Sequence, residues 1–267
     1  QSDCGSSVLC GKSADSLLGG STVKDFLNRF FHNKLAVTGS IILLLFLLMA
    51  IFAPVLAPYD PFYMDSSAPL APPSAAHLLG TDNMGRDILS RIFYGARISL
   101  RVSLVSVTIA TVAGVFLGVA AGYFGKLTDG VISRILEIMF AFPEVLLGLL
   151  IMSILGPSLN NIMIAIGIVY TPIFARITRG AVLSVKDSLY VEAARSIGVK
   201  DSTIIVRHIL PNILSPILVQ VTLSLAFAIL SEAALSFLGI GVEPDVPSWG
   251  IMLNNGKAWI EIAWWVG

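Results

Sequence analysis

Residues 102–124 read VSLVSVTIATVAGVFLGVAAGYF, an unbroken run of apolar and small residues. It contains no charged side chain, and it is longer than the roughly 20 apolar residues that a helix needs to cross the hydrocarbon core of a bilayer. Because lipid offers the backbone no hydrogen-bond partner, a spanning segment of this kind must be helical. The stretch therefore predicts a transmembrane helix.

Four further apolar runs are long enough to span a bilayer, at residues 35–56, 131–155, 159–177 and 213–238. The composition agrees, because 55% of the residues are hydrophobic and only 13% are charged, against about 25% in soluble proteins. We therefore predict an all-α membrane protein, a polytopic helical bundle with five visible transmembrane helices. The net charge is zero and the sequence contains no basic stripe, so nothing in it indicates a nucleic-acid partner.

The distribution of positive charge predicts the orientation in the membrane. With the N-terminus in the cytosol, twelve of the 17 Lys and Arg residues fall in cytosolic segments, as the positive-inside rule favours. All four tryptophans lie between Trp249 and Trp265, which is typical of an outer interfacial belt. We expect a cytosolic tail (1–34), outer loops (59–97 and 239–267) and a cytosolic loop (187–211). Cys4 and Cys10 lie in the tail, and we expect no functional role for them.

Small residues form a stripe along the second predicted span. Gly114, Gly118 and Gly122 lie four apart, in line with Ser106 and Ala110. Small side chains let helix backbones approach closely, which favours association inside a membrane. The pattern predicts a packing face, and it leaves open whether the partner helix belongs to this bundle, the simpler reading, or to another subunit.

The stretch 187–212 between the fourth and fifth spans predicts two short cytosolic helices joined by a glycine corner. Asp187 or Ser188 can cap the first helix, Gly198 suits the left-handed position after it, and the second helix is expected to stop before Pro211. Apolar residues of the first helix recur at helical spacing, which predicts one apolar face formed by Tyr190, Ala193, Ala194 and Ile197. From these residues alone, a docking surface and a plain linker are equally good interpretations.

The same stretch resembles the EAA motif, the coupling loop of the permease subunits of ATP-binding cassette (ABC) importers. The matching residues are Glu192, Ala193, Ala194, Gly198, Ile209, Leu210 and Pro211. The resemblance implies that this loop fits a groove on an ATP-binding subunit and transmits its closure. His208 stands where the family often has isoleucine, and the run 207–212 is more similar to the peptide and nickel subgroup.

A second block, on the predicted outer face, resembles the segment before the second helix of dipeptide and oligopeptide permeases. It comprises Leu79–Asp82, Gly85–Asp87, Ser90–Arg91 and Gly95–Arg97. By its residues alone, the block predicts an amphipathic interfacial helix whose arginines reach towards lipid headgroups.

A third block, residues 140–144 with the sequence FAFPE, also resembles the family, and Pro143 predicts a kink. Ionisable groups within a membrane usually face protein or water, so Glu137, Glu144 and Glu232 are candidates for the translocation path. The alternatives are an ion pair of Glu137 with Arg134 and simple access of Glu232 to the outer water.

The resemblance implies a bacterial inner-membrane subunit with several partners. These would be ATP-binding subunits, a second homologous permease, an extracytoplasmic solute-binding protein and the lipid bilayer. The family has a sixth helix, which would follow residue 267. Peptides are the preferred substrate, and nickel complexes, glutathione and other small solutes stay open.

We expect no active site in this chain, and no bound cofactor or metal. Gly11-Lys12-Ser13 lacks the first glycine of a phosphate-binding loop, because position 6 is Ser6, so ATP and magnesium would be bound by partner subunits. The three histidines are scattered and form no HExxH pair. Two other classes compete: a secondary transporter in which Glu137 or Glu144 titrates, and a membrane-embedded enzyme, which would need a convergent catalytic set.

Overall fold

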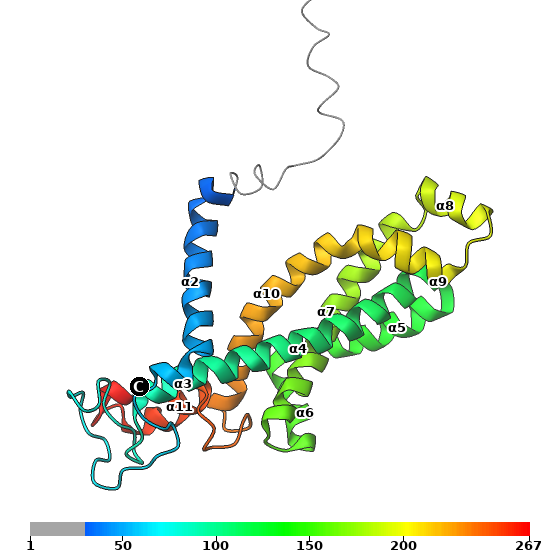
Figure 1. Cartoon of the computed structure of the whole chain (residues 1–267). Helices are drawn as coiled ribbons and strands as arrows, with labels where there is room; N and C mark the ends of the chain where they lie inside the picture. The colour runs from blue at the N-terminus through cyan, green and yellow to red at the C-terminus, as the bar shows by residue number, and fades with distance from the viewer. Residues whose placement is uncertain (1–29) are drawn as a thin grey trace, which may run out of the picture. The chain divides into compact units, whose positions relative to one another are not determined.

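The computed structural model describes residues 30–267, whose regular structure is helical (Figure 1). In chain order the longer elements are α2 (Lys34–Ile51), α3 (Ala53–Leu56), α4 (Ile88–Phe124), α5 (Lys126–Phe140), α6 (Glu144–Leu155) and α7 (Leu159–Val185). They are followed by α8 (Leu189–Ser196), α9 (Asp201–Ile204), the π-helix Ile205–Ile209, α10 (Leu210–Phe237), α11 (Trp249–Gly256) and the short 3₁₀ turns Lys257–Trp259 and Trp264–Val266. Within residues 30–267 no β-strand forms beyond an isolated bridge between Thr81 and Asp87.

Within residues 30–267, four helical segments are long and apolar enough to cross a membrane: α2, α4, α7 and the continuous stretch Asp201–Phe237. The bent pair of α5 and α6 is a fifth candidate span. The predicted polytopic helical bundle is therefore confirmed for the part of the chain that the structure describes.

The chain divides into two compact units between Leu48 and Met49, inside α2, and each is described by itself. In the first unit, α2 is stabilised at its start by Asn33, whose Oδ1 accepts from the backbone N–H groups of Leu35 (3.1 Å) and Ala36 (3.3 Å). This contact satisfies two of the N–H groups that a helix start leaves without partners.

The second unit is built around α4 and α7, which pack along much of their length, with α10 against both (Figure 1). The close approach depends on the glycine stripe of α4. A Cβ atom on Gly114 would lie 2.4 Å from Phe174 Cβ, and one on Gly122 would lie 2.9 Å from Val182 Cβ. The stripe therefore contacts α7 of the same chain.

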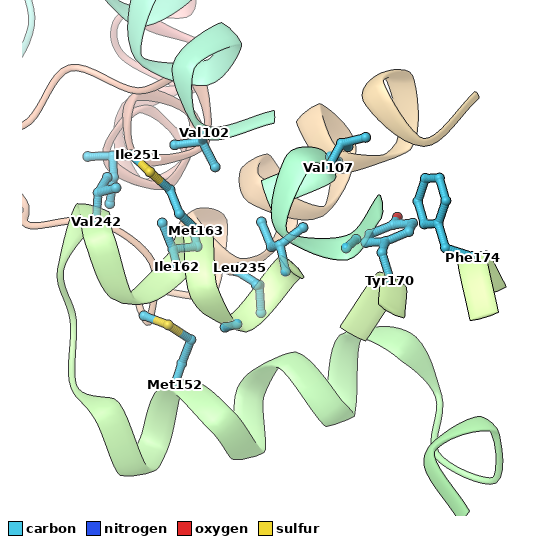
Figure 2. Packing of buried hydrophobic residues seen from close by; sticks show 14 residues of the cluster. Val102, Val107, Met152, Ile162, Met163, Tyr170, Phe174, Leu235, Val242 and Ile251 are labelled. Carbon is cyan, nitrogen blue, oxygen red and sulfur yellow. The ribbon is translucent and has the colours of Figure 1, made fainter. Parts of the chain in front are cut away.

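One apolar cluster fills the space between these helices and α6 (Figure 2). Val102 and Val107 of α4, Phe174 of α7 and Leu235 of α10 are all at most 2% exposed. Met152 reaches the cluster from α6. The second half of the broken span is thus packed on the same core as the unbroken helices.

The second span is longer than predicted. Helix α4 begins at Ile88, within the segment 59–97 that was predicted as an outer loop, and not at residue 102. Its start is fixed by Asp87, whose Oδ2 accepts from the N–H of Ser90 at 2.8 Å. A single capping carboxylate starts a helix well before the apolar run does, which a count of apolar residues does not detect.

The third span, predicted as one kinked helix over 131–155, is two helices related by a bend of 96°. Helix α5 ends at Phe140 and α6 starts at Glu144 (Figure 1). Pro143 lacks an N–H and disfavours helical geometry at Phe142, so the backbone leaves the helix there. The proline position was predicted, and the size of the bend was not.

The fourth and fifth spans also extend beyond their predicted bounds. Helix α7 continues to Val185 and not to residue 177, and α10 begins at Leu210 and not at residue 213. The second short cytosolic helix, α9, was expected to stop before Pro211. It instead continues through the π-helix into α10, and Pro211 lies in the first turn of α10, directly after the π-helix.

Candidate coupling and translocation sites

The first candidate site is the coupling hairpin, defined here as α8 and α9 with the turn between them. The turn depends on Gly198, whose φ of +81° is left-handed, a conformation that glycine adopts without steric cost. The N–H of Val199 donates to the carbonyl of Ala194 at 3.1 Å, which closes the end of α8. Ser188 lies at the N-cap position of α8, but its hydroxyl donates to Val185 O and makes no cap.

The inner side of the coupling hairpin packs on the start of α10. Val191 and Ile204 are fully buried and Ala194 is 7% exposed, in a cluster with Ile209 and Ile213. These buried side chains pack the hairpin against α10, so the hairpin is fixed to the helix that follows it.

The outer side of the coupling hairpin is apolar and exposed. Leu189 and Ile197 are 85% and 81% exposed, and Tyr190 and Ala193 are also exposed. The prediction of one apolar face of Tyr190, Ala193, Ala194 and Ile197 was therefore wrong in one respect, since Ala194 faces inward. Of the other motif residues, Glu192 and Pro211 are exposed and Leu210 is half-buried.

Polar contacts join the coupling hairpin to the neighbouring helix end. The hydroxyl of Tyr123, on α4, donates to Asp201, and the guanidinium of Arg195 lies 5.8 Å from the centre of the Tyr123 ring. A hydrogen bond with the same tyrosine raises the pKa of Arg195 above its ordinary value. Just before the hairpin, at the end of α7, Lys186 Nζ donates to Gly122 O of α4 at 3.3 Å.

The broken span is held to α7 on both sides of its bend. Before the bend, Arg179 makes a two-pronged pair with Asp129, with Nε–Oδ1 at 2.5 Å and Nη2–Oδ2 at 2.6 Å. Near the bend itself, the guanidinium of Arg176 lies 3.8 Å from the centre of the Phe140 ring.

After the bend, Glu144 forms a three-helix contact. Its Oε1 accepts from Tyr170 Oη of α7 at 2.6 Å and from Ser231 Oγ of α10 at 2.5 Å. A cavity of about 210 Å³ opens beside it, lined by residues of α5, α6, α7 and the bend that include Phe140, Phe142, Glu144 and Tyr170.

The three carboxylates predicted as path candidates lie in different environments. Glu137 is exposed and pairs with Arg134 at 3.2 Å, as the alternative interpretation had it. Glu232 is fully buried, where it accepts from Ser99 Oγ (2.8 Å) and Ser236 Oγ (2.9 Å). The alternative that Glu232 reaches the outer water is therefore wrong, and of the three only Glu144 lines this cavity.

The segment between α3 and α4, together with the first turn of α4, contains a buried polar cluster that sequence reasoning missed. Arg86 and Arg91 are each 1% exposed, so they do not reach towards headgroups as predicted. Arg86 Nε donates to Asp82 Oδ2 at 2.7 Å, and Arg91 Nη1 donates to Pro61 O at 2.9 Å. The spacing of Asp82 and Arg86, four residues apart, was the available signal.

Two family models match the chain. The model described as "Binding-protein-dependent transport system inner membrane component" matches residues 114–266, and the model described as "N-terminal TM domain of oligopeptide transport permease C" matches residues 21–73.

Similar proteins are named as permeases. The dipeptide transport system permease protein DppC of Alkalihalophilus pseudofirmus is 49% identical, over 87% of this chain and 77% of that protein. The di/tripeptide transport system permease protein DppC of Pseudomonas aeruginosa is 45% identical, over 94% and 85%. The glutathione transport system permease protein GsiD of Pectobacterium atrosepticum is 41% identical, over 90% and 80%.

A solved structure of the MetNI methionine ABC transporter in an inward-facing conformation has a similar fold. The TM-score is 0.55 at 19% sequence identity, over 65% of this chain and 82% of that one.

Proposed function

We propose that this chain, which belongs to the family of binding-protein-dependent transport system inner membrane components, forms part of the translocation path for di- or oligopeptides in an ATP-driven importer. It is a multi-pass inner-membrane protein and a permease subunit. Peptides are the proposed substrate because the names of the relatives above refer to dipeptides, tripeptides or glutathione, which is itself a tripeptide.

The coupling hairpin is the proposed docking surface for an ATP-binding subunit. One observation carries this assignment: its inner side is packed on α10, while Leu189 and Ile197 on the outer side are more than four-fifths exposed. An exposed apolar patch on a cytosolic hairpin costs solubility unless a partner covers it. A hairpin fixed to α10 can also pass a movement of that partner to the membrane helices.

The proposed cycle is alternating access. Two permease subunits enclose the path, an outer solute-binding protein delivers the peptide, and ATP is hydrolysed in the partner subunits and not in this chain. Closure of the ATP-binding subunits favours one conformation of the permease because the two conformations contact those subunits differently. The cytosol is the proposed location of the N-terminus, because the distribution of Lys and Arg along the chain favours it.

The docking proposal is tested by co-purification with the ATP-binding and sister permease subunits and by peptide uptake in proteoliposomes. Ile197→Asp puts a charge on the exposed face without disturbing the packed one, and we expect loss of the ATP-binding subunit and of uptake. Leu127→Asp is the matched control, because Leu127 is 82% exposed but lies outside the hairpin. Full retention of the ATP-binding subunit and of uptake by Ile197→Asp would overturn the proposal.

A further inference from the structure

The cavity beside the 96° bend has an acidic wall and an aromatic wall. Glu144 contributes the carboxylate, and Phe140, Phe142 and Tyr170 contribute rings. At about 210 Å³ it is smaller than a site that encloses a whole drug-sized ligand, for which roughly 300 Å³ is the lower bound. It therefore has room for one end of a larger solute.

The hydrogen bonds of Glu144 leave half of its carboxylate available. Tyr170 and Ser231 both donate to Oε1, and within residues 30–267 no hydrogen bond to Oε2 and no ion pair of Glu144 occurs. Glu137, by contrast, has Arg134 beside it. A carboxylate that is held in position by two hydroxyl groups and has no cation of its own attracts a positively charged ligand.

The aromatic wall suits the same type of ligand. The negative face of an aromatic ring attracts an ammonium group, and Phe142 is half exposed beside the bend. One ring face of Phe140 is already covered by the cation of Arg176. The rings that remain for an ammonium ligand on this wall are therefore those of Phe142 and Tyr170.

We propose that this cavity binds the α-ammonium group of a peptide during its passage, with Glu144 as the anion and Phe142 and Tyr170 as the ring wall. The proposal rests on the proposed function, in that it names the part of the peptide that this site recognises. The remainder of the peptide extends out of the cavity, so side chains beyond the first contribute little to recognition here.

Glu144→Gln tests the proposal with little risk to the fold. The amide oxygen of glutamine still accepts from Tyr170 and Ser231, so the three-helix contact is kept while the charge is removed. The test uses the complete importer in detergent without its binding protein, and it measures equilibrium binding of radiolabelled Ala-Ala and its displacement by unlabelled Ala-Ala or N-acetyl-Ala-Ala. ATP-driven uptake of Ala-Ala by the same complex, with its binding protein, is measured in proteoliposomes.

We expect the wild-type complex to bind Ala-Ala and to prefer it over the N-acetylated form about tenfold or more, the value of one hydrogen bond to a charged group. Glu144→Gln should lose this preference. Glu137→Gln, which removes an exposed carboxylate on the other side of the bend, should keep it. Tyr170→Phe keeps the charge of Glu144 but removes one hydrogen bond to it, so this variant should reduce the preference by less than Glu144→Gln does.

The two proposals fail in distinguishable ways. Absence of Ala-Ala binding by the wild-type complex, equal affinity for the acetylated peptide, or an unchanged preference in Glu144→Gln would overturn the ammonium site even if uptake is normal. Absence of ATP-driven uptake of any peptide by a correctly assembled wild-type complex would instead count against the proposed function.

Discussion

Adding one methyl group at Gly118 should weaken the contact on which the bundle is built. Gly118 faces α7, and a Cβ atom placed on it would lie 2.5 Å from Ala175 O and 2.6 Å from Thr178 Cβ. Both neighbours belong to the backbone or are bound directly to it. Neither can rotate away, so Gly118→Ala requires the two helices to separate.

The size of the effect follows from these distances. Carbon atoms in contact lie about 3.5–4.0 Å apart, so α4 and α7 must separate by about 1 Å at this point. Overpacking of this kind typically costs about 1–3 kcal/mol. For a chain of this length that cost corresponds to a fall in Tm of roughly 3–10 °C.

Gly180→Ala is a matched control on the partner helix. Gly180 lies in α7, and no atom would lie within 4 Å of a Cβ placed on it, so only the gain in helix propensity remains, at most about 1 kcal/mol. Thermal stability is measured in detergent by fluorescence-detected size-exclusion chromatography. We expect Gly118→Ala to melt several degrees below the wild type and Gly180→Ala to melt at or above it. If Gly118→Ala melts as the wild type does, α4 and α7 do not meet as described.

Three further predictions address the coupling hairpin, the broken span and the buried carboxylate. Gly198→Val forces a β-branched residue into φ +81° at a cost of about 1–2 kcal/mol, and we expect reduced co-purification of the ATP-binding subunit; unchanged recovery would show that the turn is not required. Arg179→Ala should lower the free energy of unfolding by only about 1 kcal/mol, because solvent screens the partly exposed ion pair with Asp129. A double-mutant cycle with Asp129→Ala should give non-additive Tm shifts. Glu232→Ala leaves a cavity and two buried serine hydroxyls without an acceptor, so we expect a loss of roughly 2–3 kcal/mol, seen as a lower Tm; a wild-type Tm would contradict the observed burial.

The membrane spans could be predicted because each depends on one local quantity, the length of an apolar run. The helix ends could not, because they depend on single contacts. Asp87 starts α4 far ahead of its apolar run, and the last turns of α7 carry Arg179, whose charge is neutralised by Asp129 on another helix. Hydropathy averaged over a window of the sequence does not detect either interaction.

The face of the coupling hairpin shows a different limit of sequence reasoning. Periodicity placed Tyr190, Ala194 and Ile197 on one apolar stripe, and a helix of eight residues has only two turns on which to judge it. In the structure, Val191 and Ala194 face the bundle while Leu189 and Ile197 face outward. A helix that is apolar on two sides does not reveal from its sequence which side meets its own chain and which meets a partner.

Helix α10 connects the two proposed sites. It begins at Leu210, after the π-helix Ile205–Ile209 that follows the coupling hairpin, and it carries Ser231, which donates to Glu144. Ser231 lies about 30 Å along the helix from Leu210. Ile213 and Ile217 are buried in the same cluster as Val191 of the hairpin, so the hairpin is packed on the start of α10, and in the proposed cycle the two move together. In the proposed cycle, a displacement of the hairpin therefore reaches Ser231 through a single helix, and it changes the contact that holds Glu144 at the bend. Coupling by movement of a whole helix needs no hinge at the hairpin, which agrees with the close packing found there.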